Sequence, residues 1–273
     1  YFITQDTPQA NFKDLKASGI NIEKKKDQVG FATVLKDYRT WILFIVYAAC
    51  FGIELTVYGT MDDYLQNTFQ LERATAGNIV LSFALMNIFA RTLGGFFGDK
   101  FGKLKGLRGR VLFLAGILAL QGTMLMTFST TTSIIVGIVF LILFSLSVQM
   151  AEGATFSVVP FINNKAIGSV SGIVGAGGNV GAFLAAMLLK SQSAVAEKMA
   201  ITANQGLSEE TIKAAQSAAS ATAVSSGYFI IGTIVVVTAV VSLTIRFSTE
   251  DEDVARFDSE LKPEDLIPLK VKS

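Results

Sequence analysis

Three ionisable side chains lie inside long apolar stretches of this sequence, and they are the residues there that are most able to do chemistry. They are Glu54, Arg91 and Glu152. At the middle of a membrane each charge costs roughly 2.5–3.5 kcal/mol on insertion scales, so such residues face a partner or a polar cavity. Arg91 offers five N–H donors in a planar fork and stays charged at physiological pH. It is expected either to bind a small anion through two oxygens or to form a salt bridge with one of the glutamates. We interpret Glu152 as such a partner, the alternative being a proton carrier.

The neighbours of Arg91 and the first apolar stretch add polar and aromatic groups. Asn87 precedes Arg91 by four residues, so both side chains share one face of a helix. The first apolar stretch carries three rings and a carboxylate on one helical face: Tyr47, Phe51, Glu54 and Tyr58. Such a stripe predicts either a pore wall that holds a flat ligand between rings or ordinary helix packing.

A glycine-rich run occupies residues 168–182. Four of its six glycines form two GxxxG spacings, which allow helix backbones to approach closely. Close packing does not account for Asn179, an amide in the middle of the run. Beside the backbone N–H groups of Gly175 and Gly178, this amide can donate to the oxygens of an anion. The run lacks the lysine of a phosphate-binding loop, so nucleotide binding is not expected.

These residues must be positioned by membrane helices, because the composition is that of a chain that lies largely in lipid. Apolar residues make up 51% of the sequence and charged residues 16%, and the mean hydropathy is +0.50. Soluble domains carry roughly 25% charged residues. The predicted fold is an all-α membrane protein. Apolar stretches of about 20 residues, the length that spans a bilayer, predict six transmembrane helices, at about 41–61, 74–98, 111–128, 133–162, 166–189 and 227–245.

The residue counts exclude several kinds of site. The sequence has no histidine and a single cysteine, Cys50, so histidine-based triads, histidine metal sites and internal disulfides are excluded. Neither a metal nor a cofactor is expected. No soluble catalytic module is recognisable, so the chain is not expected to be an enzyme. The net charge of +1 gives no reason to expect a nucleic-acid partner.

Lysine and arginine concentrate in segments that would lie on one side of the bilayer. By the positive-inside rule these segments are cytoplasmic, so we expect a multi-pass protein of the cytoplasmic (inner) membrane with both ends of this chain cytoplasmic. The predicted division of the chain is a cytoplasmic segment at 1–40, a six-helix bundle at 41–246 with a partly helical external loop at 191–226, and a cytoplasmic tail at 247–273.

A motif follows the second predicted span. It consists of Gly95, Asp99, Lys100, Gly102 and Lys103. It resembles the G-x-x-x-D-[RK]-x-G-[RK] motif of the major facilitator superfamily, which lies between the second and third helices of a six-helix half. The resemblance implies a cytoplasmic latch, in which the aspartate caps and pairs across helices while the basic residues hold the turn inside.

The glycine-rich run carries a more specific resemblance. Residues 172–181, which end in AGGNVG, resemble the nitrate signature of the nitrate/nitrite porter family, and residues 149–156 resemble that family's tenth helix. The resemblance covers all six predicted spans. The chain therefore looks like helices seven to twelve of a twelve-helix porter, with residues 1–40 as the end of its central loop.

The porter family binds its substrate between two halves and uses one arginine from each. The resemblance implies that Arg91 is the arginine of this half, and that Asn179 is the signature asparagine. The amino-terminal half, with the other arginine, is the expected partner, because no match to it occurs in this sequence. The full predicted substrate-binding set is Tyr47, Phe51, Asn87, Arg91, Gly175, Gly178 and Asn179.

The resemblance implies secondary active transport of nitrate and nitrite by alternating access of two halves. Nitrate is flat and monovalent, which suits planar donors and flat apolar walls. Coupling is expected to be either proton symport, with Glu54 as the candidate carboxylate, or exchange of nitrate for nitrite. Two interpretations remain open beside it. One is a major facilitator for another small anion or organic acid, and the other is a membrane subunit without transport, in which Arg91 pairs with Glu54 or Glu152.

Overall fold

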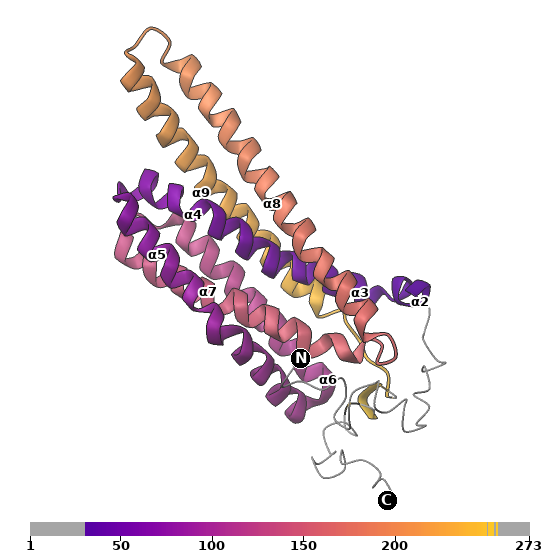
Figure 1. Ribbon diagram of the computed structural model, residues 1–273. Helices are drawn as coiled ribbons and strands as arrows, with labels where there is room; N and C mark the ends of the chain where they lie inside the picture. Colours follow the sequence, from indigo (N-terminus) through magenta and orange to yellow (C-terminus); the bar gives the residue numbers. More distant parts are fainter. Residues whose placement is uncertain (1–30, 250, 254, 256–273) are drawn as a thin grey trace, which may run out of the picture.

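The computed structural model describes residues 31–249, 251–253 and 255, and every regular element within them is a helix (Figure 1). This confirms the all-α fold class that the apolar stretches predict. Residues 1–30 of the predicted cytoplasmic segment, and most of the predicted tail, lie outside the described residues. Five helical segments are long and apolar enough to cross a membrane: Tyr38–Phe69, Arg73–Thr130, Ile134–Phe161, Ile167–Ala203 and Glu209–Ser242.

The second of these segments contains both the second and the third predicted spans. It consists of two helices, α5 (Arg73–Leu85) and α6 (Asn87–Thr130). Inside α6 the backbone leaves the helical conformation at Lys105 and Gly106, where the φ of Gly106 is +65°, a value that favours glycine. This break folds α6 into two arms, whose Phe101 and Phe113 rings stack with centroids 5.3 Å apart. Each of the two predicted spans therefore falls on its own side of the break.

The first segment begins earlier than predicted and is not a uniform helix. It contains α3 (Tyr38–Tyr47), a π-helical turn η1 (Ala48–Gly52) and α4 (Ile53–Phe69), preceded by the short helix α2 (Phe31–Lys36). Asp37 caps α3 by accepting a hydrogen bond from the backbone N–H of Arg39. A π turn holds an extra residue, so it offsets the helical faces before and after it. The sequence periodicity assumed an uninterrupted α-helix here.

The remaining helices begin and end near the predicted bounds, except where α8 and α9 extend into the predicted external loop. They are α7 (Ile134–Val158), the 3₁₀ turn η2 (Val159–Phe161), α8 (Ile167–Ala203) and α9 (Glu209–Ser242). Pro160 lies in the 3₁₀ turn and ends α7, as expected from its missing N–H. Residues 191–226 are more helical than predicted. Helices α8 and α9 continue through residues 191–226, apart from a short turn that ends at Ser208, the N-cap of α9. The two helices extend together beyond the other helices (Figure 1).

Glycines let several of these helices cross in backbone contact. A Cβ at Gly94 of α6 would lie 2.7 Å from the carbonyl carbon of Met150 on α7, and a Cβ at Gly153 would collide with the carbonyl of Arg91. On α8, a Cβ at Gly177 would collide with the backbone of α3, and a Cβ at Gly181 would collide with the backbone of η1. Such close crossings exclude larger side chains and fix the relative positions of the helices. They set the level at which Arg91 lies against α7.

Candidate functional site

Arg91 lies on the first arm of α6, between carboxylates from two other helices. Its Nη2 donates to Oε2 of Glu152 on α7 and lies 3.6 Å from Oε2 of Glu54 on α4. The two carboxylate side chains are buried, at 0% and 8% exposure, whereas the Arg91 side chain is 40% exposed. Arg91 thus pairs with both glutamates, whereas the salt-bridge interpretation expected one of them. Of the guanidinium nitrogens, Nη2 is the one with a hydrogen-bond partner among the described residues, so N–H donors remain for an anion.

The predicted aromatic pair lies beside this ion cluster. The guanidinium carbon of Arg91 is 5.9 Å from the centroid of the Phe51 ring, within the range of a cation–π interaction. Phe51 stacks on Tyr47 with centroids 5.3 Å apart and planes 4° from parallel, and Phe156 of α7 meets Tyr47 edge-on. A flat ligand between these two rings is therefore excluded, because they are already in stacking contact. Tyr58 lies apart from them, near Phe83 of α5.

Asn87 joins the cluster through Glu54 rather than through Arg91. Its amide Nδ2 donates to Oε1 of Glu54 at 3.3 Å. Asn87 and Arg91 share one face of a helix, and both side chains contact the carboxylate of Glu54. The prediction that their side chains face the same way is confirmed, and Asn87 gives Glu54 a donor that is independent of the arginine.

The glycine-rich run divides into two sets. Gly178 touches the aromatic pair, because a Cβ there would lie 2.5 Å from Phe51 and 3.1 Å from Tyr47. Gly175 has no atom within 4 Å of the place where its Cβ would be, and the side chain of Asn179 is exposed. Helix packing within this chain therefore explains Gly178 but not Gly175, and no hydrogen bond among the described residues ties Asn179 to the Arg91 cluster.

Buried polar atoms without partners surround Arg91. Among the described residues, no hydrogen bond satisfies Oε2 of Glu54, Nε of Arg91, Oε1 of Glu152, or either amide atom of Gln149. A buried polar group left unsatisfied costs about 1–3 kcal/mol, so the cluster suits water or a polar ligand. Gln149 is fully buried and precedes Glu152 by three residues. In the sequence Gln149 is visible only as an amide in an otherwise apolar stretch, and no role was predicted for it.

A groove of about 440 Å³ runs from Arg91 along α6 and α7. Gly95 and Gly153 lie in its middle, and Asp99 and Arg110 lie at its other end. Arg91 is one of the residues that line this groove. The groove thereby connects the two sets of charged residues that the sequence analysis treated separately.

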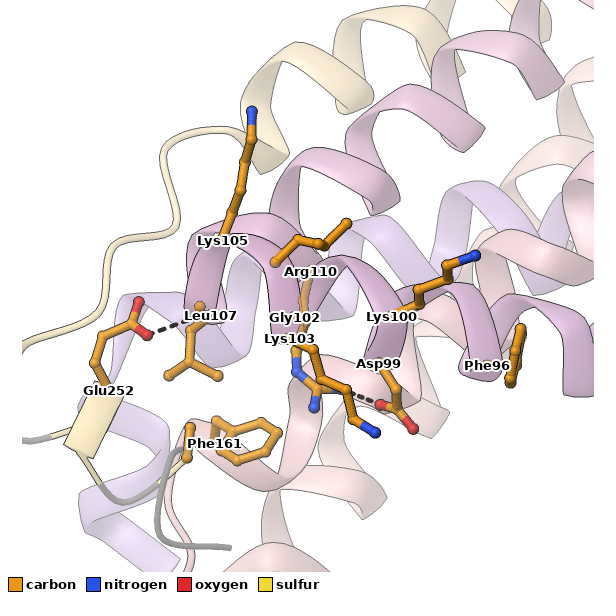
Figure 2. A pocket seen from close by; sticks show the side chains of 13 residues that line it. Phe96, Asp99, Lys100, Gly102, Lys103, Lys105, Leu107, Arg110, Phe161 and Glu252 are labelled. Carbon is orange, nitrogen blue, oxygen red and sulfur yellow. Dashed lines mark hydrogen bonds and ion pairs between the residues drawn. The ribbon is translucent and has the colours of Figure 1, made fainter. Parts of the chain in front are cut away.

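Four of the five motif residues, namely Asp99, Lys100, Gly102 and Lys103, line a pocket of about 980 Å³ beside the break in α6 (Figure 2). Asp99 forms an ion pair with Arg110, which lies on the second arm and outside the motif. Arg110 also donates to the carbonyl of Ser157 at 3.1 Å and lies 4.8 Å from the Phe161 ring centroid. Gly102 leaves room for this side chain, since a Cβ there would be 2.7 Å from Nε of Arg110. The expected pairing of Asp99 across helices is present, whereas Lys100 and Lys103 are exposed.

The residues after α9 dock at this end of the bundle. Oε2 of Glu252 accepts a hydrogen bond from the N–H of Leu107 at 2.9 Å (Figure 2), and Asp251 pairs with Arg39 at 2.9 Å. Partial burial raises the pKa of Asp251, but hydrogen bonds from Ser248 and Arg39 outweigh it and lower the pKa overall. This contact therefore stabilises the fold above the ordinary pKa of an aspartate and is lost as the pH falls through the lowered value.

We expect unequal effects from the two partners of the Asp99–Arg110 pair. Asp99→Asn removes one half-exposed ion pair and should cost about 1 kcal/mol. Arg110→Gln also removes the hydrogen bond to Ser157 and the contact with Phe161, and should cost about 2–3 kcal/mol. Thermal unfolding of the two purified variants in detergent would show the larger drop in midpoint for Arg110→Gln. Equal drops would mean that the ion pair is the only contact that matters.

Comparison with known proteins gives one family match and several relatives. A model of the Major Facilitator Superfamily matches residues 1–186. The high affinity nitrate transporter 2.5 of Arabidopsis thaliana is 38% identical over 200 residues, which cover 72% of this chain and 39% of that protein. The nitrate/nitrite transporter NrtP of Picosynechococcus is 34% identical over 172 residues, which cover 60% of this chain and 32% of that protein. The chain thus spans less than half the length of these relatives.

A solved structure has the same kind of fold. The inward-facing, unoccupied crystal structure of a bacterial homolog to the human lysosomal transporter Spinster matches with a TM-score of 0.61 at 16% sequence identity. The match covers 86% of this chain and 52% of that chain. At this identity the likeness concerns the fold alone, and the six arms and helices described above correspond to about half of the larger structure.

Proposed function

Because this chain belongs to the Major Facilitator Superfamily, a family of transporters rather than enzymes, we propose that it forms the carboxy-terminal six-helix half of a secondary transporter of nitrate and nitrite. The names of its relatives confirm the resemblance to the nitrate/nitrite porters. Rocking of two halves around a site at their interface is the transport mechanism that this architecture supports. The complete porter has twelve helices, and its amino-terminal half is the proposed partner.

The observation that carries the proposal is the partly exposed side chain of Arg91, whose guanidinium lies beside a ring and between two buried carboxylates. Its free N–H donors lie in one plane, as do the three oxygens of nitrate, so two donors can meet two oxygens. The ring of Phe51 supplies a flat apolar wall next to them. A single guanidinium matches a monovalent anion better than it matches phosphate or sulfate.

The uncovered side of α8 supports the proposed partner. Gly168, Gly172 and Gly175 have nothing within 4 Å of their Cβ positions, and Asn179 is exposed on the same helix. Small residues in a membrane helix allow another helix or a substrate to approach closely. In the complete porter this face and Arg91 would border the amino-terminal half, where Asn179 and the second arginine of the family would complete the site.

We place the protein in the cytoplasmic membrane as a multi-pass protein, with both ends of this chain in the cytoplasm. The support is the group of exposed basic residues at the break in α6, which are Lys100, Lys103, Lys105 and Arg108. The residues before α3 and after α9 lie at the same end of the bundle, as the pairing of Arg39 with Asp251 demonstrates. Positively charged turns remain on the cytoplasmic side of membranes.

The proposal is tested by uptake of labelled nitrate into proteoliposomes that contain the complete porter. Unlabelled nitrite and chlorate, which are small monovalent oxyanions, should compete with nitrate, whereas acetate and lactate should not. Competition by the carboxylates but not by nitrite would support the second candidate, a major facilitator for organic acids. Absence of uptake for every anion, in protein that is correctly inserted, would support a subunit without transport.

A further inference from the structure

The Arg91 cluster contains more negative than positive charge before any substrate arrives. Glu54 and Glu152 face one guanidinium, and both carboxylates are buried. With both ionised, the cluster carries one net negative charge. A nitrate ion bound to Arg91 would make it two, within a region of low dielectric where repulsion between like charges is strong. Anion binding here therefore requires that one carboxylate lose its charge.

The two carboxylates differ in what they would keep if an anion displaced them from Arg91. Glu54 would keep the hydrogen bond from Asn87, which favours its ionised form. Glu152 accepts from Arg91, and its Oε1 has no donor among the described residues. Once separated from Arg91, Glu152 would be a fully buried carboxylate without a donor. Such a group binds a proton rather than stay charged.

We propose that Glu152 is the displaceable counter-ion of Arg91 and the proton carrier of the transport cycle, in place of Glu54. This inference rests on the proposed function. Nitrate takes the position of the Glu152 carboxylate on the guanidinium, and Glu152 takes up one proton from solvent as it is released. The hydrogen bond from Arg91 Nη2 to Glu152 is broken, hydrogen bonds to nitrate replace it, and an O–H bond forms on Glu152. The net charge of the cluster is then the same with and without substrate.

The surroundings of Glu152 are compatible with a neutral carboxyl group. Gln149, one turn earlier on α7, is fully buried, and neither of its amide atoms has a hydrogen-bond partner among the described residues. The titratable or charged groups that face Glu152 from the packed elements are Tyr47 of α3, Cys50 of η1, Glu54 of α4 and Arg91 of α6. A phenol and a thiol are ordinarily neutral near pH 7. Glu54 and Arg91 are therefore the only charges among these four, and the groove along α6 and α7 is lined by Arg91 of this cluster.

The same contact decides between the two modes of coupling. In an empty carrier the Glu152 carboxylate remains paired with Arg91, so the arginine keeps a counter-ion while the unloaded site changes its orientation across the membrane. An obligatory exchanger needs the opposite, namely an empty site that cannot reorient. The structure therefore favours proton symport over obligatory exchange of nitrate for nitrite.

The test compares two transport modes in proteoliposomes that contain the complete porter. Glu152→Gln fixes the side chain in a form without charge, so uptake of nitrate driven by a pH gradient should fall about tenfold or more. Counterflow of nitrate at equal pH on both sides should persist and lose its dependence on pH. Glu54→Gln, the matched variant, should slow uptake but leave its dependence on the pH gradient in place.

Each other outcome has a definite meaning. Gradient-driven uptake that persists in Glu152→Gln, or that is lost in Glu54→Gln instead, would overturn the role of Glu152. Should Glu152→Gln fail to insert, proton uptake by the unmodified porter decides, because adding nitrate to weakly buffered protein should remove about one proton per nitrate bound. No proton uptake on binding would also overturn the inference. Absence of nitrate transport by the unmodified porter in either mode would instead contradict the proposed function.

Discussion

Replacing Arg91 with lysine in the complete porter is expected to lower nitrate uptake about 100-fold, because a charge-assisted hydrogen bond is worth about 1.5–3 kcal/mol and lysine cannot form the planar pair. Lysine keeps the positive charge, so Glu152 and Glu54 still have a counter-ion and the protein should insert and fold. The loss would therefore fall on substrate binding. It is measured as the initial rate of labelled nitrate uptake, normalised to the amount of porter in the membrane.

Two controls separate recognition of the anion from charge compensation. Arg73→Lys changes an exposed arginine at the start of α5 and should leave uptake as it was. The double variant Arg91→Gln with Glu152→Gln removes one charge of each sign. If the arginine served only the ion pair, this neutral variant would recover counterflow of nitrate at equal pH, the mode that does not need Glu152. Recovery, or near-normal uptake by Arg91→Lys, would remove Arg91 from the substrate site.

Replacing Gly94 with alanine is expected to destabilise the bundle by about 3 kcal/mol, at the upper end of the cost of overpacking. The new Cβ would lie 2.7 Å from the carbonyl carbon of Met150, and a backbone atom cannot move aside as a flexible side chain can. Helices α6 and α7 would have to separate at the level of Arg91 and Glu152. The thermal midpoint of the purified chain in detergent measures this loss.

Gly116→Ala is the matched control for this substitution. Gly116 lies on the other arm of α6, and nothing is within 4 Å of its Cβ position. Alanine has the higher helix propensity, by about 0.8–1.0 kcal/mol, so this variant should be neutral or slightly more stable. A midpoint for Gly94→Ala that matches that of Gly116→Ala would mean that the α6–α7 crossing is not closely packed.

The glycine-rich run at residues 168–182 has two physical roles that its sequence alone does not separate. Gly177, Gly178 and Gly181 are required by contacts with α3, η1 and the aromatic pair. Gly168, Gly172 and Gly175 have no such contact within this chain. We expect the first set to affect stability of the isolated chain when changed to alanine. The second set should matter only when the other half is present.

Residue types and their order along the chain are enough to indicate the class of the protein and the residues worth testing. Composition and the length of the apolar stretches specify membrane helices, since a backbone in lipid must satisfy its own hydrogen bonds. The cost of a charge in lipid singles out Glu54, Arg91 and Glu152 without any structure. The motif that begins at Gly95 and the glycine-rich run carry the family resemblance, which depends on residue types and order alone.

Only the tertiary structure decided which of these residues meet. Glu54, Arg91 and Glu152 come from three helices, and their contacts depend on how each helix is rotated and where it crosses the next. The crossings are set by close contacts at Gly94 and Gly153, and the π turn before Glu54 shifts its face in a way that a fixed helical period does not predict. These contacts are the reason for proposing Glu152, which is bound to Arg91, rather than Glu54, which also accepts from the Asn87 amide, as the proton carrier.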